Sequence, residues 1–277
     1  MSLETLIDME INYGTICIEQ RIIFSEYLER DVITDVYIPQ GKFSEKEMAL
    51  LLVNDGQDLR KMDFATILDN LILEGTIEPI IVVAMHCGAD RMMEYGTACQ
   101  SDYRGRGGKA GLYNKFIFDE LLPYLRNEMG FESFKEKSFA GFSLGGLCAM
   151  DIVWNHAQEF VKSGVFSGSL WWRRRGYNDE GYDCEKDRIM HLQVQNGTYN
   201  PWLKFFFECG ALDETADRNK NGVIDSIDDA LDMITHLKSL GYTDSDIKYL
   251  ELADGRHNVE TWARAFPDFL KWGWGRK

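Results

Sequence analysis

The stretch that decides the fold is KSFAGFSLGGLCAM, residues 137–150. Its first six residues, Lys137 to Phe142, predict a strand, and the small residues after Ser143 predict a closely packed helix. Gly141 and Gly145 flank Ser143 where a tight turn brings backbone segments too close for a Cβ atom. Such a strand, turn and helix hold a serine exposed on a strained elbow, which predicts Ser143 as a nucleophile. The alternative is a glycine-rich turn without chemistry.

The segments on either side of this elbow indicate an α/β protein. Apolar runs predict strands at residues 15–24, 32–38, 48–53, 80–84, 160–166, 202–208 and 247–252. Helical spacing covers residues 59–73, 112–129, 144–154, 226–240 and 259–272. Because strands and helices alternate after the first fifty residues, we expect a mostly parallel central sheet with helices on both faces. With the elbow, this pattern predicts the α/β-hydrolase fold, whose site lies at the carboxyl ends of the strands.

Length, charge and cysteine usage narrow the classes of function. The 277 residues contain no linker or repeat, so we expect one domain over residues 1–277, with residues 1–30 as its N-terminal strand region. The net charge of −15 argues against nucleic-acid binding, and an anionic substrate would need a local basic patch. The six cysteines show no CxxC spacing, which argues against a zinc site.

The sequence also bears on the compartment. No apolar stretch is long enough to span a membrane, and the N-terminus has no signal-peptide core. As written, the sequence therefore fits the cytoplasm. If Met1-Ser2-Leu3 stands in place of an export signal, the protein is periplasmic or secreted.

A serine nucleophile needs a base and an acid, which this fold supplies in the order serine, acid, histidine. His257 follows the strand at 247–252 and precedes the last helix, which is the position of the base. Asp213 follows the strand at 202–208, 44 residues before His257, and would fix the imidazole tautomer. The competing acids are Glu208, Glu214 and Asp217.

Two backbone N–H groups are needed to stabilise the oxyanion of the tetrahedral intermediate. One is expected from Leu144, directly after the nucleophile. The other is expected from Gln57, in the loop of residues 54–58 after the third strand, where Gly56 would let the backbone approach the substrate. An ordinary polar turn is the alternative for this loop.

These residues resemble a known family. Asp55-Gly56-Gln57, the elbow at 141–146, and Gly255-Arg256-His257 with Trp262 are similar to the putative esterase family. That family includes enterochelin, feruloyl and acetylxylan esterases, S-formylglutathione hydrolase and the mycolyltransferases. The resemblance runs from about residue 31 to 272. It implies a serine esterase that forms an acyl-enzyme on Ser143 and needs no cofactor for catalysis.

The substrate suggested by the resemblance is a small-molecule or carbohydrate-linked ester. The segment at 166–172 looks most like enterochelin esterases, which hydrolyse a siderophore trilactone but usually carry an extra N-terminal β-domain. The alternatives are a feruloyl or acetylxylan carbohydrate esterase, an acyltransferase, or a non-catalytic binding domain. Trp171, Trp172 and Arg173 follow a strand and could stack on an aromatic acyl group. Equally, the tryptophans could be core residues and the arginine part of a solvated loop.

A second motif lies outside this chemistry. Residues 217–228 place oxygen-bearing side chains at loop positions 1, 3, 5, 9 and 12 and a glycine at position 6, as in EF-hand calcium loops. Position 12 is an aspartate, shorter than the usual glutamate, and no clear helix precedes the loop. We expect a structural Ca²⁺ here, with an acidic turn as the alternative. The predicted ligands are Asp217, Asn219, Asn221, Val223, Asp225 and Asp228.

Overall fold

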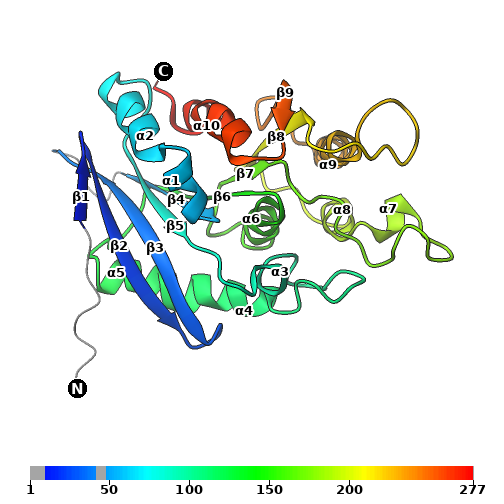
Figure 1. Cartoon of the computed structure of the whole chain (residues 1–277), viewed down its shortest axis with the longest axis horizontal. Helices are drawn as coiled ribbons and strands as arrows, with labels where there is room; N and C mark the ends of the chain where they lie inside the picture. The colour runs from blue at the N-terminus through cyan, green and yellow to red at the C-terminus, as the bar shows by residue number, and fades with distance from the viewer. Residues whose placement is uncertain (1–9, 42–47, 277) are drawn as a thin grey trace.

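Nine strands form one sheet in the order β1-β2-β3-β5-β4-β6-β7-β8-β9 (Figure 1). The structure is a computed structural model, which describes residues 10–41 and 48–276; Met1-Ser2-Leu3 lie outside this part. The strands are β1 (Glu10–Tyr13), β2 (Ile16–Ser25), β3 (Arg30–Pro39), β4 (Ala49–Asn54), β5 (Ile80–Met85), β6 (Lys137–Phe142), β7 (Lys162–Phe166), β8 (Lys204–Leu212) and β9 (Ile247–Arg256).

The sheet is antiparallel at its N-terminal edge and parallel elsewhere. β1, β2, β3 and β5 pair antiparallel in turn, whereas β5, β4, β6, β7, β8 and β9 pair parallel. β4 and β5 are buried along their whole length, as continuous apolar runs of a parallel sheet covered on both faces must be. The predicted α/β class and the mostly parallel sheet are therefore confirmed.

Helices cover both faces of the sheet and make two separate cores (Figure 1). One core lies under α1 (Gln57–Lys61), α2 (Phe64–Leu73) and α10 (Val259–Trp274). The other lies under α4 (Ala110–Lys115), the π-helical turn η2 (Phe116–Leu121), α5 (Leu122–Asn127), α6 (Leu144–Asn155), α8 (Ile189–Gln195) and α9 (Asp225–Leu240). Within the described part of the chain, no helix is both long and apolar enough to cross a membrane.

Two predicted helices are interrupted in the structure. The stretch at 59–73 divides into α1 and α2 because Asp63 adopts a left-handed conformation with φ 52°. The stretch at 112–129 contains η2, which is followed by Pro123 at the start of α5; proline has no N–H for the helical ladder. The short elements β1, α3 (Arg91–Glu94) and α7 (Cys184–Asp187) have no counterpart among the predicted segments.

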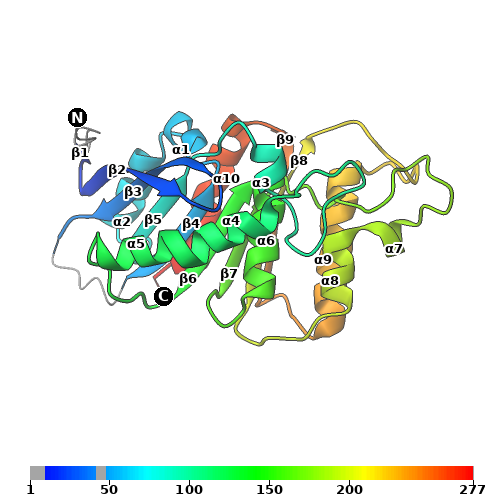
Figure 2. The same ribbon diagram turned by 90° about the horizontal axis from the view of Figure 1, so that it is seen from below.

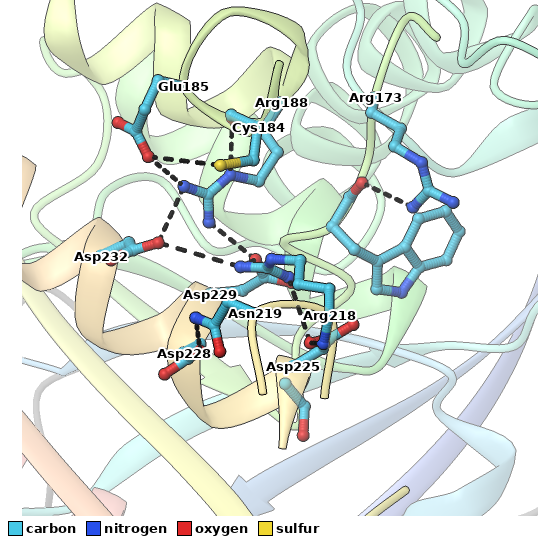
Figure 3. Close-up of polar contacts among 12 residues, drawn as sticks. Arg173, Cys184, Glu185, Arg188, Arg218, Asn219, Asp225, Asp228, Asp229 and Asp232 are labelled. Carbon is cyan, nitrogen blue, oxygen red and sulfur yellow. Dashed lines mark hydrogen bonds and ion pairs between the residues drawn. The ribbon is translucent and has the colours of Figure 1, made fainter. Parts of the chain in front are cut away.

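The parallel strands all point their carboxyl ends to one edge of the sheet, where the predicted site residues follow them. The segments after β7 and β8 are long loops that lead to α7 and α9. Figure 2 shows them extending together beyond α8 and α9 at one end of the molecule. An ion pair of 2.6 Å between Arg218 and Asp229, and one of 2.7 Å between Arg188 and Asp229, fasten both segments to α9 (Figure 3).

Candidate active site

The turn between β6 and α6 holds Ser143 with φ 53° and ψ −120°. A positive φ is strained for a residue with a side chain and is found where the fold imposes it. A Cβ on Gly141 would lie 2.3 Å from the carbonyl oxygen of Gly145, and one on Gly145 would lie 2.6 Å from Asp55 Oδ2. Both glycines are therefore required by close backbone packing, and the predicted strand, turn and helix are present.

Hydrogen bonds fix this elbow to the neighbouring strands. The Ser143 N–H donates to the carbonyl of Phe166 at 2.8 Å, and the Ser169 N–H donates to the carbonyl of Ser143 at 3.0 Å. From the other side, Asn54 Nδ2 donates to the carbonyl of Gly145 at 2.9 Å. The elbow thus sits between the ends of β4 and β7, and the Ser143 residue is half-buried.

His257 lies between β9 and α10, and Asp213 lies directly after β8. The His257 Nδ1 atom is 3.9 Å from Asp213 Oδ2, which is an ion-pair distance and longer than a hydrogen bond. The Asp213 side chain is only 1% exposed, whereas that of His257 is 40% exposed. Among the described residues, neither Asp213 oxygen has a hydrogen-bond partner. The imidazole is therefore the group that can compensate this buried carboxylate.

Trp262 connects the elbow with the imidazole. Its ring stacks on Phe142 with centroids 5.0 Å apart and meets the His257 ring edge-on at 5.4 Å. Its Nε1 atom donates to Ser167 Oγ at 2.9 Å, which anchors the indole to the end of β7. Trp262 belongs to the residues that resemble the family, and in the structure its ring packs between Phe142 and the imidazole of His257.

Of the competing acids, Glu208 lies in β8 as expected and is completely buried. Burial, reinforced by the negative charge of Asp213, raises the pKa of Glu208 to about 8. Its nearest donor is Ser167 Oγ at 3.5 Å. Glu214 instead accepts the Ser226 N–H at 2.7 Å, and Asp217 accepts backbone N–H groups of its own loop. Asp213 is thus the acid that faces His257.

The two predicted oxyanion donors both begin helices. Gln57 is the first residue of α1 and Leu144 the first of α6, and the first N–H groups of a helix have no partner within it. The Gln57 side chain is turned aside, since its Oε1 accepts the Cys87 N–H at 3.1 Å. Both backbone N–H groups therefore suit anion stabilisation, which stays a prediction.

One feature of this loop differs from the sequence interpretation, and a second was not predicted. A Cβ on Gly56 would lie 2.5 Å from the backbone of Ala84, so packing against β5 accounts for the glycine rather than approach to a substrate. In addition, Arg91 Nε donates to the buried carboxylate of Asp55 at 2.6 Å, and its Nη2 atom contacts the carbonyl of Phe142 at 3.3 Å. This bridge between the loop and the elbow joins Arg91 and Asp55, which are 36 positions apart, so no local sequence pattern predicts it.

A cavity of about 270 Å³ lies beside the segments that follow β7 and β8. Trp171 and Arg173 line it, and so do Arg104 and Arg106 from the segment between α3 and α4. Trp172 does not. Its side chain is fully buried in the core, and its ring lies against the glycines Gly96 and Gly107. The cavity is lined by Tyr103, Arg104, Arg106, Trp171, Arg173, Tyr177, Glu214, Ala216 and Asp225.

The predicted calcium loop has the turn of such a loop, with Gly222 at φ 86° and α9 beginning at Asp225. Its polar groups, however, bind one another. Asp217 accepts the N–H groups of Asn221 and Gly222, Asn221 Oδ1 accepts the Val223 N–H, and the amides of Asn219 and Asn221 donate to Asp228. Asp225 is turned to Tyr177 and the Arg218 N–H. Across the described residues, no group of three or more His, Cys, Asp or Glu side chains is arranged to hold a metal.

Comparisons with known proteins agree with this geometry. A family model described as "Esterase: Putative esterase" matches residues 25–272. An endo-1,4-beta-xylanase/feruloyl esterase of Xylanibacter ruminicola is 28% identical over 177 residues, which is 58% of this chain and 23% of that protein. The chain thus spans about a quarter of the length of this relative.

Solved structures share the fold at low identity. A ferulic acid esterase has a TM-score of 0.66 at 18% identity, over 94% of this chain and 98% of the other. The enterochelin esterase of Shigella flexneri has a TM-score of 0.69 at 18% identity, over 92% of this chain and 57% of the other. The siderophore hydrolase EstB of Aspergillus nidulans has a TM-score of 0.66 at 15% identity, over 99% of this chain and all of the other. These likenesses establish the α/β-hydrolase-like fold.

Proposed function

This chain belongs to the putative esterase family, whose model matches residues 25–272, and we propose that it hydrolyses esters through an acyl-enzyme on Ser143. The observation that carries the proposal is the buried Asp213 carboxylate, which lacks a hydrogen bond in the described chain and lies 3.9 Å from His257. A carboxylate left in this state is suited to stabilise an imidazolium. The strained elbow supports the assignment of Ser143.

In the proposed mechanism, Ser143 Oγ attacks the ester carbonyl carbon while His257 accepts its proton. Asp213 stabilises the resulting imidazolium, and the N–H groups of Gln57 and Leu144 stabilise the oxyanion. The tetrahedral intermediate collapses, the alcohol leaves with the proton from His257, and the acyl group remains on Ser143 Oγ. Water then attacks the acyl-enzyme by the same steps and releases the acid and the free serine.

For the substrate, we propose an ester that carries an aromatic ring. Tyr103, Trp171 and Tyr177 line the cavity, and such rings bind another aromatic group by stacking. A siderophore trilactone with aromatic acyl groups and a feruloyl ester both fit this chemistry, and relatives of both kinds share the fold. An acetyl group of xylan has no ring to place there.

The mechanism is tested with a fluorophosphonate probe and three esters: enterobactin, methyl ferulate and acetylated xylan. We expect the probe to label Ser143, turnover of a ring-bearing ester, and loss of both in Ser143→Ala. Ser169→Ala is the matched control, because Ser169 follows the neighbouring strand and donates to the carbonyl of Ser143 through its backbone N–H, which alanine keeps. Absence of labelling and turnover in the wild type would indicate a non-catalytic binding domain. Ester products formed only with an added alcohol would indicate an acyltransferase.

For the loop at 217–228, we propose a structural Ca²⁺ with no part in the chemistry. Support comes from the residue types and from the Gly222 turn. The ligands would be Asp217, Asn219, Asn221, Asp228 and the backbone of Val223, with Asp225 as a ligand only if it left Arg218. About 1 mM Ca²⁺ should raise the thermal midpoint of the wild type and not that of Asp217→Ala. An unchanged wild-type midpoint would mean that the internal hydrogen bonds alone hold the loop.

A further inference from the structure

Arg173 is a buried cation without a counter-charge. In the described part of the chain, the buried cationic residues are Lys162, Arg173 and Arg188. Lys162 pairs with Glu136, and Arg188 pairs with Asp229 at 2.7 Å. Arg173 is only 8% exposed, yet no described carboxylate lies within ion-pair distance of it. Figure 3 shows Arg173 apart from the cluster in which Arg188 and Arg218 meet their acidic partners.

The surroundings of Arg173 are aromatic rather than acidic. Its guanidinium lies 3.9 Å from the ring centroid of Tyr177, 5.2 Å from that of Tyr103 and 5.5 Å from that of Trp171. Its Nη1 atom donates to the carbonyl of Trp171 at a long 3.4 Å, and its Nε atom has no partner in the described chain. Cation–π contacts offset part of the desolvation penalty, but a buried charge normally also has a hydrogen-bonded partner.

The two acidic residues that line the cavity, Asp225 and Glu214, accept hydrogen bonds from groups other than Arg173. Asp225 accepts the Arg218 N–H at 2.7 Å and the Tyr177 hydroxyl at 3.2 Å, and Glu214 accepts the Ser226 N–H. Arg106, a second cation of the lining, is paired with Asp102, which lies outside the cavity. The cavity therefore presents the charge of Arg173 to whatever enters it.

This cavity lies at the same sheet edge as the proposed nucleophile. Trp171 and Arg173 follow β7, whose next residues include Ser169, hydrogen-bonded to the carbonyl of Ser143. On the other side, Glu214 comes directly after Asp213. A group bound to Arg173 and an ester carbonyl at Ser143 would thus lie at the same edge of the sheet.

We propose that Arg173 binds a carboxylate of the substrate, so that the natural substrate is an ester that also carries a free carboxylate. The proposal rests on the proposed esterase function and specifies its substrate class. A guanidinium binds a carboxylate through two parallel hydrogen bonds, and a desolvated site makes this pair strong. In a protein with a net charge of −15, such a ligand needs a local cation, and Arg173 with Arg104 beside it supplies one.

The test compares esters that differ only in this charge. For a carboxylate on the acyl side, methyl 4-carboxycinnamate is compared with methyl 4-carbamoylcinnamate. For one on the alcohol side, 4-carboxyphenyl cinnamate is compared with 4-carbamoylphenyl cinnamate. All rates are normalised to hydrolysis by hydroxide. In one pair, we expect kcat/KM to be at least about tenfold higher for the carboxylate than for the amide, mainly through a lower KM. The pair that shows this preference identifies which side of the ester enters the cavity.

Arg173→Gln should abolish this preference, and Arg173→Lys should retain a reduced one, because lysine keeps the charge without the planar fork. Arg126→Gln, which changes an exposed arginine on α5, should leave the preference intact. Equal kcat/KM within both pairs, or a preference that survives Arg173→Gln, overturns the proposal. If Arg173→Gln fails to fold, a full wild-type preference in Arg173→Lys overturns the proposal instead.

Failure of the esterase mechanism looks different. In that case the wild type hydrolyses neither member of either pair, and a fluorophosphonate does not label Ser143. The role of Arg173 is then tested without turnover, by calorimetric measurement of 4-carboxycinnamate binding. Binding at least about tenfold weaker in Arg173→Gln than in Arg126→Gln supports the carboxylate site, and equal binding refutes it.

Discussion

The carboxyl group of Glu208 gives the sharpest prediction for stability. It is completely buried in β8, its Oε1 atom has no partner in the described chain, and the charge of Asp213 lies close by. Burial in the first place, and Asp213 in the second, raise its pKa from 4.5 to about 8. At neutral pH the native protein therefore holds this group mostly protonated. Glu208→Gln replaces the neutral acid by an amide of the same shape that cannot ionise.

The pH dependence of stability follows from the protonation of Glu208 in the folded and in the unfolded chain. Below pH 4.5 the carboxyl is protonated in both the folded and the unfolded protein, so it adds no pH dependence. Between 4.5 and about 8 the unfolded chain releases the proton and the folded chain keeps it, so stability falls as the pH rises. At about 1.4 kcal/mol per factor of ten in proton affinity, the full loss is at most about 5 kcal/mol. Relaxation of the site lowers such penalties, and we expect about 2–4 kcal/mol.

The assay is urea unfolding at 25 °C, followed by circular dichroism, at pH 5 and at pH 8.5. The free energy of unfolding of Glu208→Gln, relative to the wild type, should be about 2–4 kcal/mol higher at pH 8.5 than at pH 5. Glu128→Gln alters an exposed carboxyl after α5 and should show no such change. A difference between wild type and Glu208→Gln that is the same at both pH values would refute the reasoning, because Glu208 would then be ionised alike in both states.

Two further predictions concern the site and its elbow. Asp213→Asn should lower kcat by about 10³–10⁴-fold with little change in folding, because the amide favours the wrong tautomer of His257. Steady-state kinetics measure this loss, and a loss under tenfold would assign the role of the acid to another carboxyl group. Gly141→Ala should lower the free energy of unfolding by about 3 kcal/mol or more, since its Cβ would lie 2.3 Å from a backbone oxygen. Gly111→Ala in α4, where a Cβ meets nothing within 4 Å, should instead raise it by about 0.5–1 kcal/mol, and equal effects of the two alanines in urea unfolding would contradict this account.

The sheet was predictable because its strands are marked by local apolar runs. β4, β5 and β6 appear in the sequence as nearly continuous buried segments, and the structure starts and ends them within a residue or two. β1 carries no such signal, because its four residues contain no continuous apolar run; its Ile11 and Tyr13 are 43% and 45% exposed. The break between α1 and α2 depends on one left-handed residue, Asp63, and aspartate adopts this conformation only occasionally, so residue type alone does not predict the break.

The site was predictable where chain order and turn chemistry define it. Ser143, Asp213 and His257 each follow a strand that could be read from the sequence, so their common edge follows from the parallel sheet. Which of two adjacent tryptophans faces the cavity depends on packing: Trp172 fills the space left by two glycines, and Trp171 is left half-exposed. The proximity of Glu208 to Asp213 likewise needs the folded chain.

The distribution of uncompensated charge singles out one edge of the sheet. Elsewhere in the described chain, buried charges have close partners, as Arg188 has in Asp229. Asp213, Glu208 and Arg173 are buried with poor or absent hydrogen bonding, and all three lie in β8 or in the segments after β7 and β8. A fold selected for stability alone would pair or remove such groups, since each unpaired charge costs free energy. Their concentration beside Ser143 is expected if the missing partners are supplied during the reaction: an imidazolium for Asp213 and a substrate carboxylate for Arg173. Asp213 and Arg173, which lower stability, thus serve the proposed chemistry and the proposed specificity of the site, whereas Glu208 is mostly protonated at neutral pH and carries no charge there.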